Sequence, residues 1–136
     1  MLKENTNSRI ISVIDDDIDI VTLFYDALSS LSGIMIYKFT DPIIALEHIK
    51  MNKESYILIL SDFRMPGLNG LELAKKTKDI NKNIRTILMT AFDIDDKLFD
   101  KHVKEGIING FLQKPVEIKA LFSEINKQIG LSKESR

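Results

Sequence analysis

The sequence predicts an α/β fold in which a five-stranded parallel sheet is covered by helices on both faces. Short apolar stretches of strand length alternate along the chain with segments whose apolar residues recur at helical spacing. The stretch YILIL at 56–60 is apolar at every position, which is typical of a strand buried on both faces of a parallel sheet. Because the connections are short and the alternation is strict, we expect right-handed crossovers and a doubly wound, three-layer sandwich.

The sequence pattern predicts five strands and five helices. The expected strands are residues 9–14, 34–39, 56–60, 85–89 and 109–112. The expected helices are marked by apolar residues at helical spacing, in chain order Ile18, Val21, Leu23 and Leu28; Ile43, Ala45, Leu46 and Ile49; Leu68, Leu71, Leu73 and Ala74; Leu98, Phe99 and Val103; Leu121, Phe122, Ile125 and Ile129. Thr40 or Asp41 can cap the second helix with Pro42 in its first turn, and aspartates within 93–96 place negative charge at the start of the fourth.

The length of 136 residues is that of one domain, which we expect to span 9–130 between a flexible segment at 1–8 and a polar tail at 131–136. Hydrophobic residues make up 44% and charged residues 29%, as in ordinary globular proteins. With no cysteine, the chain has neither disulfides nor thiolate metal sites. The sequence also contains no signal-peptide pattern and no apolar run of membrane-spanning length. These features predict a cytoplasmic protein that does not contact membranes.

The charge balance argues against direct nucleic-acid binding. The net charge is -1 and the isoelectric point is about 6.1. Lysines are scattered along the chain and do not form a basic patch, which is the usual footprint of a protein that binds phosphate backbones.

The stretch VIDDDIDI at 13–20 concentrates negative charge directly behind the first strand. A calcium loop would need glycine at its sixth position and glutamate at its twelfth, where this chain has Ile20 and Asp26. Two other interpretations stay open at this point: a phosphatase-type D-x-D pair, and a magnesium site completed by residues far along the chain.

Four of the expected strands end in segments that carry polar side chains. They are Asp15, Asp16 and Asp17 after the first, Ser61 and Asp62 at the third, Thr90 and Ala91 at the fourth, and Lys114 with Pro115 at the fifth. Since ligands of open α/β sheets bind outside the carboxyl ends of the strands, we expect these side chains to form one site. Asp17 and Asp19 are interpreted as cap and turn residues, and His48 and His102 as exposed residues on polar helical faces.

The residue types at this edge suit phosphoryl transfer. Asp15, Asp16 and Asp62 would repel one another unless they share a cation, and oxygen ligands without histidine or cysteine favour Mg²⁺. One carboxylate can act as a nucleophile toward phosphorus, while Lys114 and Thr90 would contact the phosphoryl oxygens. Neither a general base nor an activated water is evident, which favours a recipient of phosphate over a fast hydrolase.

At these residues the chain resembles the response-regulator receiver domain of two-component signalling, the family typified by the chemotaxis regulator. The resemblance covers about residues 9–129. It rests on the acidic pair Asp15 and Asp16, on D-x-x-M-P-G-x-x-G running from Asp62 to Gly70, on Thr90-Ala91, and on FLQKP at 111–115. It implies the flavodoxin-like strand order 2-1-3-4-5.

The resemblance also implies a role for each site residue. Asp62 would be the phosphoacceptor; Asp16, Asp62 and the Arg64 backbone carbonyl would bind Mg²⁺ directly, with Asp15 acting through water. Thr90 and Phe111 would form the switch pair, with phenylalanine where tyrosine is often found. Arg64 and Phe92 occupy positions that tune phosphate lifetime, and their bulk predicts slow loss of the phosphoryl group.

The implied function is a phosphoacceptor switch, not an enzyme. A sensor histidine kinase or phosphotransfer protein would phosphorylate Asp62, and the surface of the fourth helix, fifth strand and fifth helix would then bind a protein partner or output domain. Homodimerisation through the fourth helix stays open, as do the identities of kinase and stimulus and whether the chain is part of a larger regulator. Two alternatives are a degenerate receiver that binds partners without phosphorylation and an aspartate-nucleophile phosphatase.

Overall fold

Five parallel strands form one sheet in the spatial order β2-β1-β3-β4-β5 in the computed structural model, which describes residues 9–91 and 97–134. The strands are β1 (Ile10–Ile14), β2 (Met35–Phe39), β3 (Tyr56–Asp62), β4 (Arg85–Thr90) and β5 (Gly110–Gln113). Every residue of the central strand β3 is buried, because helices cover both of its faces. The fold class and the strand order expected from the sequence are confirmed.

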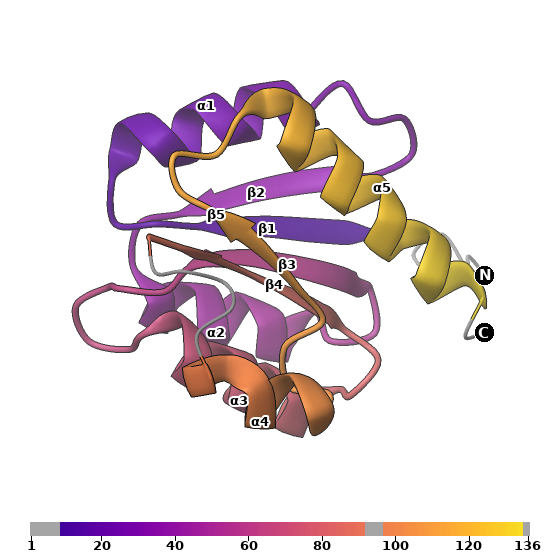
Figure 1. Ribbon diagram of the computed structural model, residues 1–136. Helices are drawn as coiled ribbons and strands as arrows, with labels where there is room; N and C mark the ends of the chain where they lie inside the picture. The colour runs from indigo at the N-terminus through magenta and orange to yellow at the C-terminus, as the bar shows by residue number, and fades with distance from the viewer. Residues whose placement is uncertain (1–8, 92–96, 135–136) are drawn as a thin grey trace, which may run out of the picture.

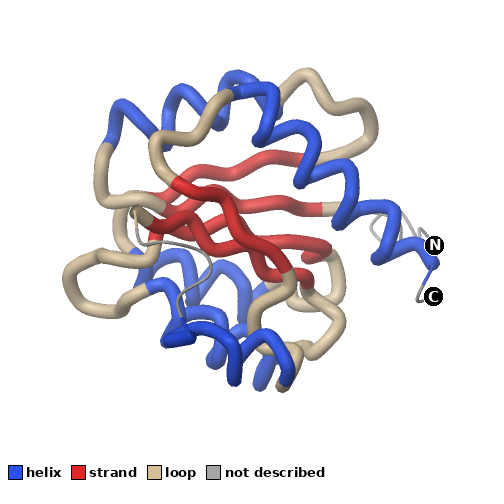
Figure 2. Tube along the Cα trace, in the orientation of Figure 1, coloured by secondary structure: helices blue, strands red, loops and turns tan. Residues whose placement is uncertain are grey.

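Helices lie on both faces of this sheet and complete the three layers (Figures 1 and 2). One layer holds α1 (Ile18–Leu28) and α5 (Ile118–Glu134). The opposite layer holds α2 (Pro42–Met51), α3 (Gly70–Ile80) and α4 (Asp100–Lys104), the last preceded by the 3-10 helix η2 (Lys97–Phe99). The described part of the expected fourth helix is therefore one turn of 3-10 helix followed by a short α-helix.

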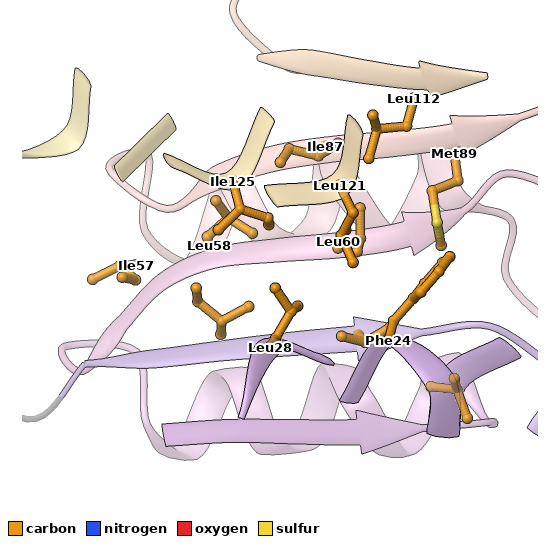
Figure 3. Packing of buried hydrophobic residues seen from close by; sticks show 13 residues of the cluster. Phe24, Leu28, Ile57, Leu58, Leu60, Ile87, Met89, Leu112, Leu121 and Ile125 are labelled. Atoms are coloured by element: carbon orange, nitrogen blue, oxygen red, sulfur yellow. The ribbon is translucent and has the colours of Figure 1, made fainter. Parts of the chain in front are cut away.

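Two large apolar cores and a smaller third one hold the layers together. Figure 3 shows the first, in which Phe24 and Leu28 of α1 and Leu121 and Ile125 of α5 face the sheet residues Leu58, Leu60, Ile87, Met89 and Leu112. The second lies between the sheet and α2 and α3, around Ala45, Ile49, Ile59 and Leu73. Ile59 lies between Leu58 and Leu60 in β3 but packs in the other core, because successive side chains of a strand point to opposite faces.

Short polar side chains fix where the helices begin. The Asp17 carboxylate accepts hydrogen bonds from the backbone N–H groups of Asp19 at 2.9 Å and Ile20 at 3.4 Å, so the interpretation of Asp17 as a cap is confirmed. Asp41 caps α2 in the same way, with Pro42 in the first turn.

The C-terminal boundary differs from the expected one. α5 runs to Glu134, past the end expected at 130, because polar residues such as Ser132 and Lys133 can continue a helix as well as form a tail. The expected flexible segment at 1–8 lies outside the described residues, as do the aspartates within 93–96. None of the helices in the described part of the chain has the length and apolar character needed to cross a membrane.

Candidate functional site

The carboxyl ends of the strands bring the predicted site residues to one edge of the sheet, on the left of Figure 1. Asp15 and Asp16 follow β1 directly, Asp62 ends β3, Thr90 ends β4, and Lys114 follows β5. Because the strands are parallel and in register, residues that are far apart in the sequence arrive side by side.

Three carboxylates meet at this edge. Each of Asp15, Asp16 and Asp62 offers one oxygen atom, and these oxygens lie within 4.8 Å of one another. Asp15 is 1% exposed and Asp62 is 7% exposed, whereas Asp16 faces solvent. The cluster is therefore buried on one side and open on the other, which is the arrangement expected of a cation site that keeps part of its water shell.

Lys114 supplies a positive charge within the cluster. Its Nζ donates hydrogen bonds to Asp62 Oδ1 at 2.9 Å and to Asp15 Oδ2 at 3.4 Å. Burial would lower the pKa of Lys114, but its hydrogen bond to Asp62 and the charges of Asp15 and Asp62 outweigh burial and raise the pKa above its usual value. The Lys114–Pro115 peptide bond is cis.

The carboxyl group of Asp15 has a pKa above its usual value. Burial raises the pKa of Asp15, and the nearby charge of Asp62 raises it further. The Asp17 backbone N–H, 3.0 Å away, and the Lys114 ammonium act in the opposite direction without cancelling the shift. The pKa of Asp15 is therefore raised despite the Lys114 ammonium, and a divalent cation beside this carboxyl group would favour its ionised form.

A cavity of about 110 Å³ opens over the Asp62 carboxylate. Its lining residues are Asp62, Phe63, Arg64, Thr90, Ala91 and Lys114. A second, more open hollow of about 550 Å³ adjoins it and shares Phe63 and Arg64 with it. The first cavity has room for a small group, and Asp62, Thr90 and Lys114 bring polar groups to a lining that also contains Phe63 and Ala91.

Comparison with known proteins agrees with this geometry. The profile of the response regulator receiver domain family matches residues 11–126, which is most of the chain.

The chain belongs to the response regulator receiver domain family.

Relatives of this receiver domain differ greatly in length. It is 29% identical to the sporulation initiation phosphotransferase F of Bacillus subtilis, over 92% of this chain and 96% of that protein. It is 27% identical to the cyclic di-GMP phosphodiesterase response regulator RpfG of Xanthomonas campestris, over 92% of this chain but only 33% of the relative's length. Among solved structures, a response regulator receiver domain protein from Clostridium thermocellum is 26% identical with a TM-score of 0.80, covering 95% of this chain and 99% of that one. Receiver domains are modules of two-component signalling, so this chain is one such module.

The backbone that carries Asp62 in this receiver domain is held in place by a glycine. A Cβ atom on Gly70 would lie 2.3 Å from the Asp62 carbonyl oxygen and 3.0 Å from the Phe63 Cα atom. The Gly70 N–H donates a hydrogen bond to the Phe63 carbonyl oxygen at 2.8 Å, and the Phe63 N–H donates to the Met89 carbonyl oxygen at 2.8 Å. The start of α3 thus packs directly against the strand end that presents Asp62.

A row of three phenylalanine rings connects the Asp62 strand with β5. The Phe63 ring is 5.4 Å from the Phe99 ring, measured between centroids, in an edge-to-face arrangement, and the Phe99 ring is 5.1 Å from the Phe111 ring. Phe99 is 1% exposed and belongs to a small core with Leu88 and Ile108. The family resemblance places Phe111 in the switch pair, and Phe99 is one of the apolar residues that mark the expected fourth helix, but no local pattern connects either ring with Phe63.

The two histidines are less exposed than the sequence suggested. His48 packs at 4.3 Å from the Tyr37 ring, and its Nδ1 lies 2.6 Å from the Tyr56 hydroxyl oxygen. His102 is half-buried, with Nδ1 3.8 Å from Glu105 Oε1. Both histidines are therefore only partly exposed, because their partners come from tertiary packing as well as from the helix. Phe92, expected to affect phosphate lifetime, lies outside the described residues.

Proposed function

We propose that Asp62 accepts a phosphoryl group from a phosphohistidine on a sensor histidine kinase or a phosphotransfer protein. The observation that carries this proposal is the Asp62 carboxylate itself, which ends the central strand beside two further carboxylates and 2.9 Å from a lysine ammonium. A carboxylate in this setting is placed for attack, and its charge is balanced by groups that also suit the charge of the incoming phosphate.

Asp15, Asp16, Asp62 and the backbone carbonyl of Arg64 would hold Mg²⁺ in this site. The observed donor set fits the ion, because it consists of carboxylate oxygens with one open side. When bound, Mg²⁺ supplies charge neutralisation at a phosphoryl oxygen. The buried Asp15 contributes negative charge that attracts the ion, while the exposed Asp16 is accessible from solvent.

Asp62, Lys114 and Thr90 would each act on the transferred phosphoryl group. Asp62 attacks phosphorus, the phosphorus–nitrogen bond of the donor breaks, and the electron pair leaves with the donor imidazole, so that an acyl phosphate forms on Asp62. Lys114 stays within hydrogen-bonding reach of the transferred group, and the Thr90 hydroxyl binds one of its oxygens. In this proposal the protein is a phosphoacceptor switch, which assists its own phosphorylation but does not turn over a substrate.

The signal would be read on the surface formed by α4, β5 and α5. Thr90 ends β4 and Phe111 lies in the neighbouring strand β5, where Leu88 of β4 pairs with it. A Thr90 hydroxyl drawn toward the phosphoryl group would leave space for the Phe111 ring, and this would change the surface that a protein partner or output domain binds.

We further propose that Arg64 and Phe92 slow the loss of the phosphoryl group. Arg64 lines both the cavity over Asp62 and the adjoining hollow, so its long side chain is placed to restrict attacking water. If so, Arg64→Ala and Phe92→Ala would each shorten the lifetime of the phosphorylated state, and a longer lifetime in either variant would contradict the idea.

Intact mass spectrometry tests the main proposal. Wild type and Asp62→Asn would be incubated with acetyl phosphate, with Mg²⁺ or with a chelator. One phosphoryl group should be gained by wild type with Mg²⁺ and in neither control, because the asparagine side chain has the same shape as aspartate without the nucleophilic carboxylate. No gain in a folded wild-type protein would favour a binding module that works without phosphorylation, and turnover of a generic phosphate ester would favour a phosphatase.

A further inference from the structure

Helix α4, in the same layer as α2 and α3 (Figure 1), buries fewer of its own side chains than its neighbours do. α3 buries Leu73 and Ala74 against the sheet, whereas none of the residues of α4 is buried. Among the side chains described between Lys97 and Ile108, those of Phe99 and Ile108 are buried. Residues on either side of α4 therefore hold it on the sheet, and segments with few buried contacts of their own move most easily.

Phe99, directly before α4, anchors the N-terminal end of this helix. Its side chain is 1% exposed and packs with Leu88 of β4 and with Ile108 in the small third core. Its ring lies between two others, 5.4 Å from the Phe63 ring and 5.1 Å from the Phe111 ring, measured between centroids. Because α4 begins at the next residue, a displacement of the Phe99 ring is passed directly to the helix.

Phe63, on one side of Phe99, is a fixed support. Its N–H donates a hydrogen bond to the Met89 carbonyl oxygen at 2.8 Å, and its carbonyl oxygen accepts one from the Gly70 N–H at 2.8 Å. The two bonds join Phe63 to β4 and to the start of α3. The rings of Phe63 and Phe99 meet edge to face, with an interplanar angle of 89°, which is a favourable arrangement of aromatic rings.

Phe111, on the other side of Phe99, is the ring that moves in the proposed switch. It is only partly buried, and it lies in β5, which is last in the strand order and pairs with β4 alone. A shift of the Phe111 ring toward Thr90 would withdraw one of the surfaces on which Phe99 packs. Protein interiors are close-packed, and an unfilled gap is costly. Since Phe63 is held in place, the gap closes if Phe99 follows Phe111.

The C-terminal end of α4 is held differently. The His102 carbonyl oxygen accepts hydrogen bonds from the backbone N–H groups of Ile107 at 2.9 Å and Ile108 at 3.2 Å. Between them Gly106, with φ of 79°, turns the chain toward β5. This end of α4 is thus joined to the segment that leads into β5, whereas the other end depends on Phe99. A displacement of Phe99 should therefore reorient α4.

We propose that Phe99 is the positioning residue that couples Phe111 to α4, so that the orientation of α4 follows the phosphorylation of Asp62. This inference rests on the proposed function, in which phosphorylation of Asp62 draws Thr90 and then Phe111 inward. It assigns the transmission to one ring outside the site. Without the Phe99 ring, Asp62 should still be phosphorylated, but α4 should no longer respond.

The distance between spin labels on α4 and α2 tests the proposal. The natural chain has no cysteine, so Lys101→Cys on α4 and Glu47→Cys on α2 supply two attachment points, both in place of exposed side chains. Pulsed electron paramagnetic resonance would measure the distance before and after incubation with acetyl phosphate and Mg²⁺. Intact mass would measure the phosphoryl group on the same samples. With Phe99 in place, the distance should shift on phosphorylation.

Phe99→Ala in the labelled protein should gain the phosphoryl group but lose most of the distance shift. Phe99→Leu keeps more apolar volume, so it should stay folded and lose part of the shift even if circular dichroism shows that Phe99→Ala unfolds the domain. Phe24→Leu is the matched control for Phe99→Leu. Phe24 is 2% exposed in the core on the opposite face of the sheet, so this variant should keep the whole shift.

An equal shift in Phe99→Leu and Phe24→Leu would overturn the inference, and so would phosphorylation of the labelled protein without any shift. The proposed function would stand in both cases, because intact mass reports phosphorylation independently of the distance. A folded labelled protein that gains no phosphoryl group would instead overturn the proposed function, and this inference with it.

Discussion

Lys114 Nζ lies 2.9 Å from Asp62 Oδ1, so the ammonium group occupies one side of the carboxylate proposed to receive phosphate. The same nitrogen is 3.4 Å from the buried Asp15 carboxylate. Lys114 therefore competes with any cation bound by these carboxylates and at the same time provides charge for an incoming phosphoryl group. Removal of the Lys114 ammonium should therefore strengthen cation binding and at the same time slow phosphorylation.

Lys114→Met should bind Mg²⁺ more tightly, by about threefold or more, because the competing positive charge is gone. It should accept phosphate from acetyl phosphate about a hundredfold more slowly, because one group that stabilises the transferred phosphoryl oxygens is lost. Calorimetric titration with Mg²⁺ and time-resolved intact mass would measure the two effects. Lys114→Arg keeps the positive charge, so its Mg²⁺ affinity and its phosphorylation rate should both lie between those of Lys114→Met and wild type. Weaker Mg²⁺ binding by Lys114→Met than by wild type would contradict this prediction.

Gly70→Ala should destabilise the protein by about 2 kcal/mol or more, because the new methyl group would overlap the Asp62 carbonyl oxygen and Leu88 Cδ1. Gly130→Ala is the matched control: Gly130 lies in α5, and a Cβ atom there meets nothing within 4 Å. This substitution should stabilise the protein by about 0.5 to 1 kcal/mol through helix propensity. Urea unfolding of both variants tests the contrast, and equal effects would show that the close packing at Gly70 is unimportant.

Phe99→Leu should cost about 1 to 2 kcal/mol of stability, since Phe99 is fully buried between the Phe63 and Phe111 rings. In a double-mutant cycle with Phe63→Leu, we expect a coupling energy of about 0.5 to 1.5 kcal/mol. Phe24 packs in the core on the other face of the sheet, so Phe24→Leu and Phe99→Leu should be additive. If the stability losses of the Phe63 and Phe99 substitutions are additive, the contact between these two rings does not contribute to stability.

Lys78 should make stability rise with pH above neutrality. Its Nζ donates hydrogen bonds to the Ile84 carbonyl oxygen at 2.6 Å and to Asn109 Oδ1 at 2.7 Å, and burial together with the Arg85 charge lowers the pKa of Lys78 from 10.5 to about 8. Between these two values the unfolded chain binds more protons at this position than the folded chain does. The contribution of Lys78 to the free energy of unfolding therefore increases with pH in this window.

Urea unfolding of wild type and Lys78→Met from about pH 7 to about pH 10 measures this contribution as the difference between the two proteins. The difference should shift in favour of wild type as pH rises. Lys76→Met, which removes an exposed lysine from the same helix, controls for the loss of a positive charge. A difference that is flat or falls with pH would show that the ammonium of Lys78 is not disfavoured in the folded protein.

The sequence by itself determined the alternation of strands and helices and the type of each element. A strand buried on both faces is visible in the sequence as an unbroken apolar stretch, such as 56–60. The start of a helix is visible as a capping residue followed by proline, as at Asp41 and Pro42. The meeting of Asp15, Asp62 and Lys114 at one edge could also be predicted, because parallel strands must deliver their carboxyl ends to the same edge. The residue types at those ends, from Asp15 to Lys114, restrict the chemistry that is feasible there.

Other features were decided by the tertiary structure alone. Asp15 and Asp16 are neighbours in the sequence, yet one is buried and the other exposed, because successive side chains leaving a strand end point in different directions. The partners of His48 come from β2 and β3, and the row from Phe63 to Phe111 joins three elements of distant sequence position. Such contacts have no local pattern, since they depend on how elements pack in three dimensions.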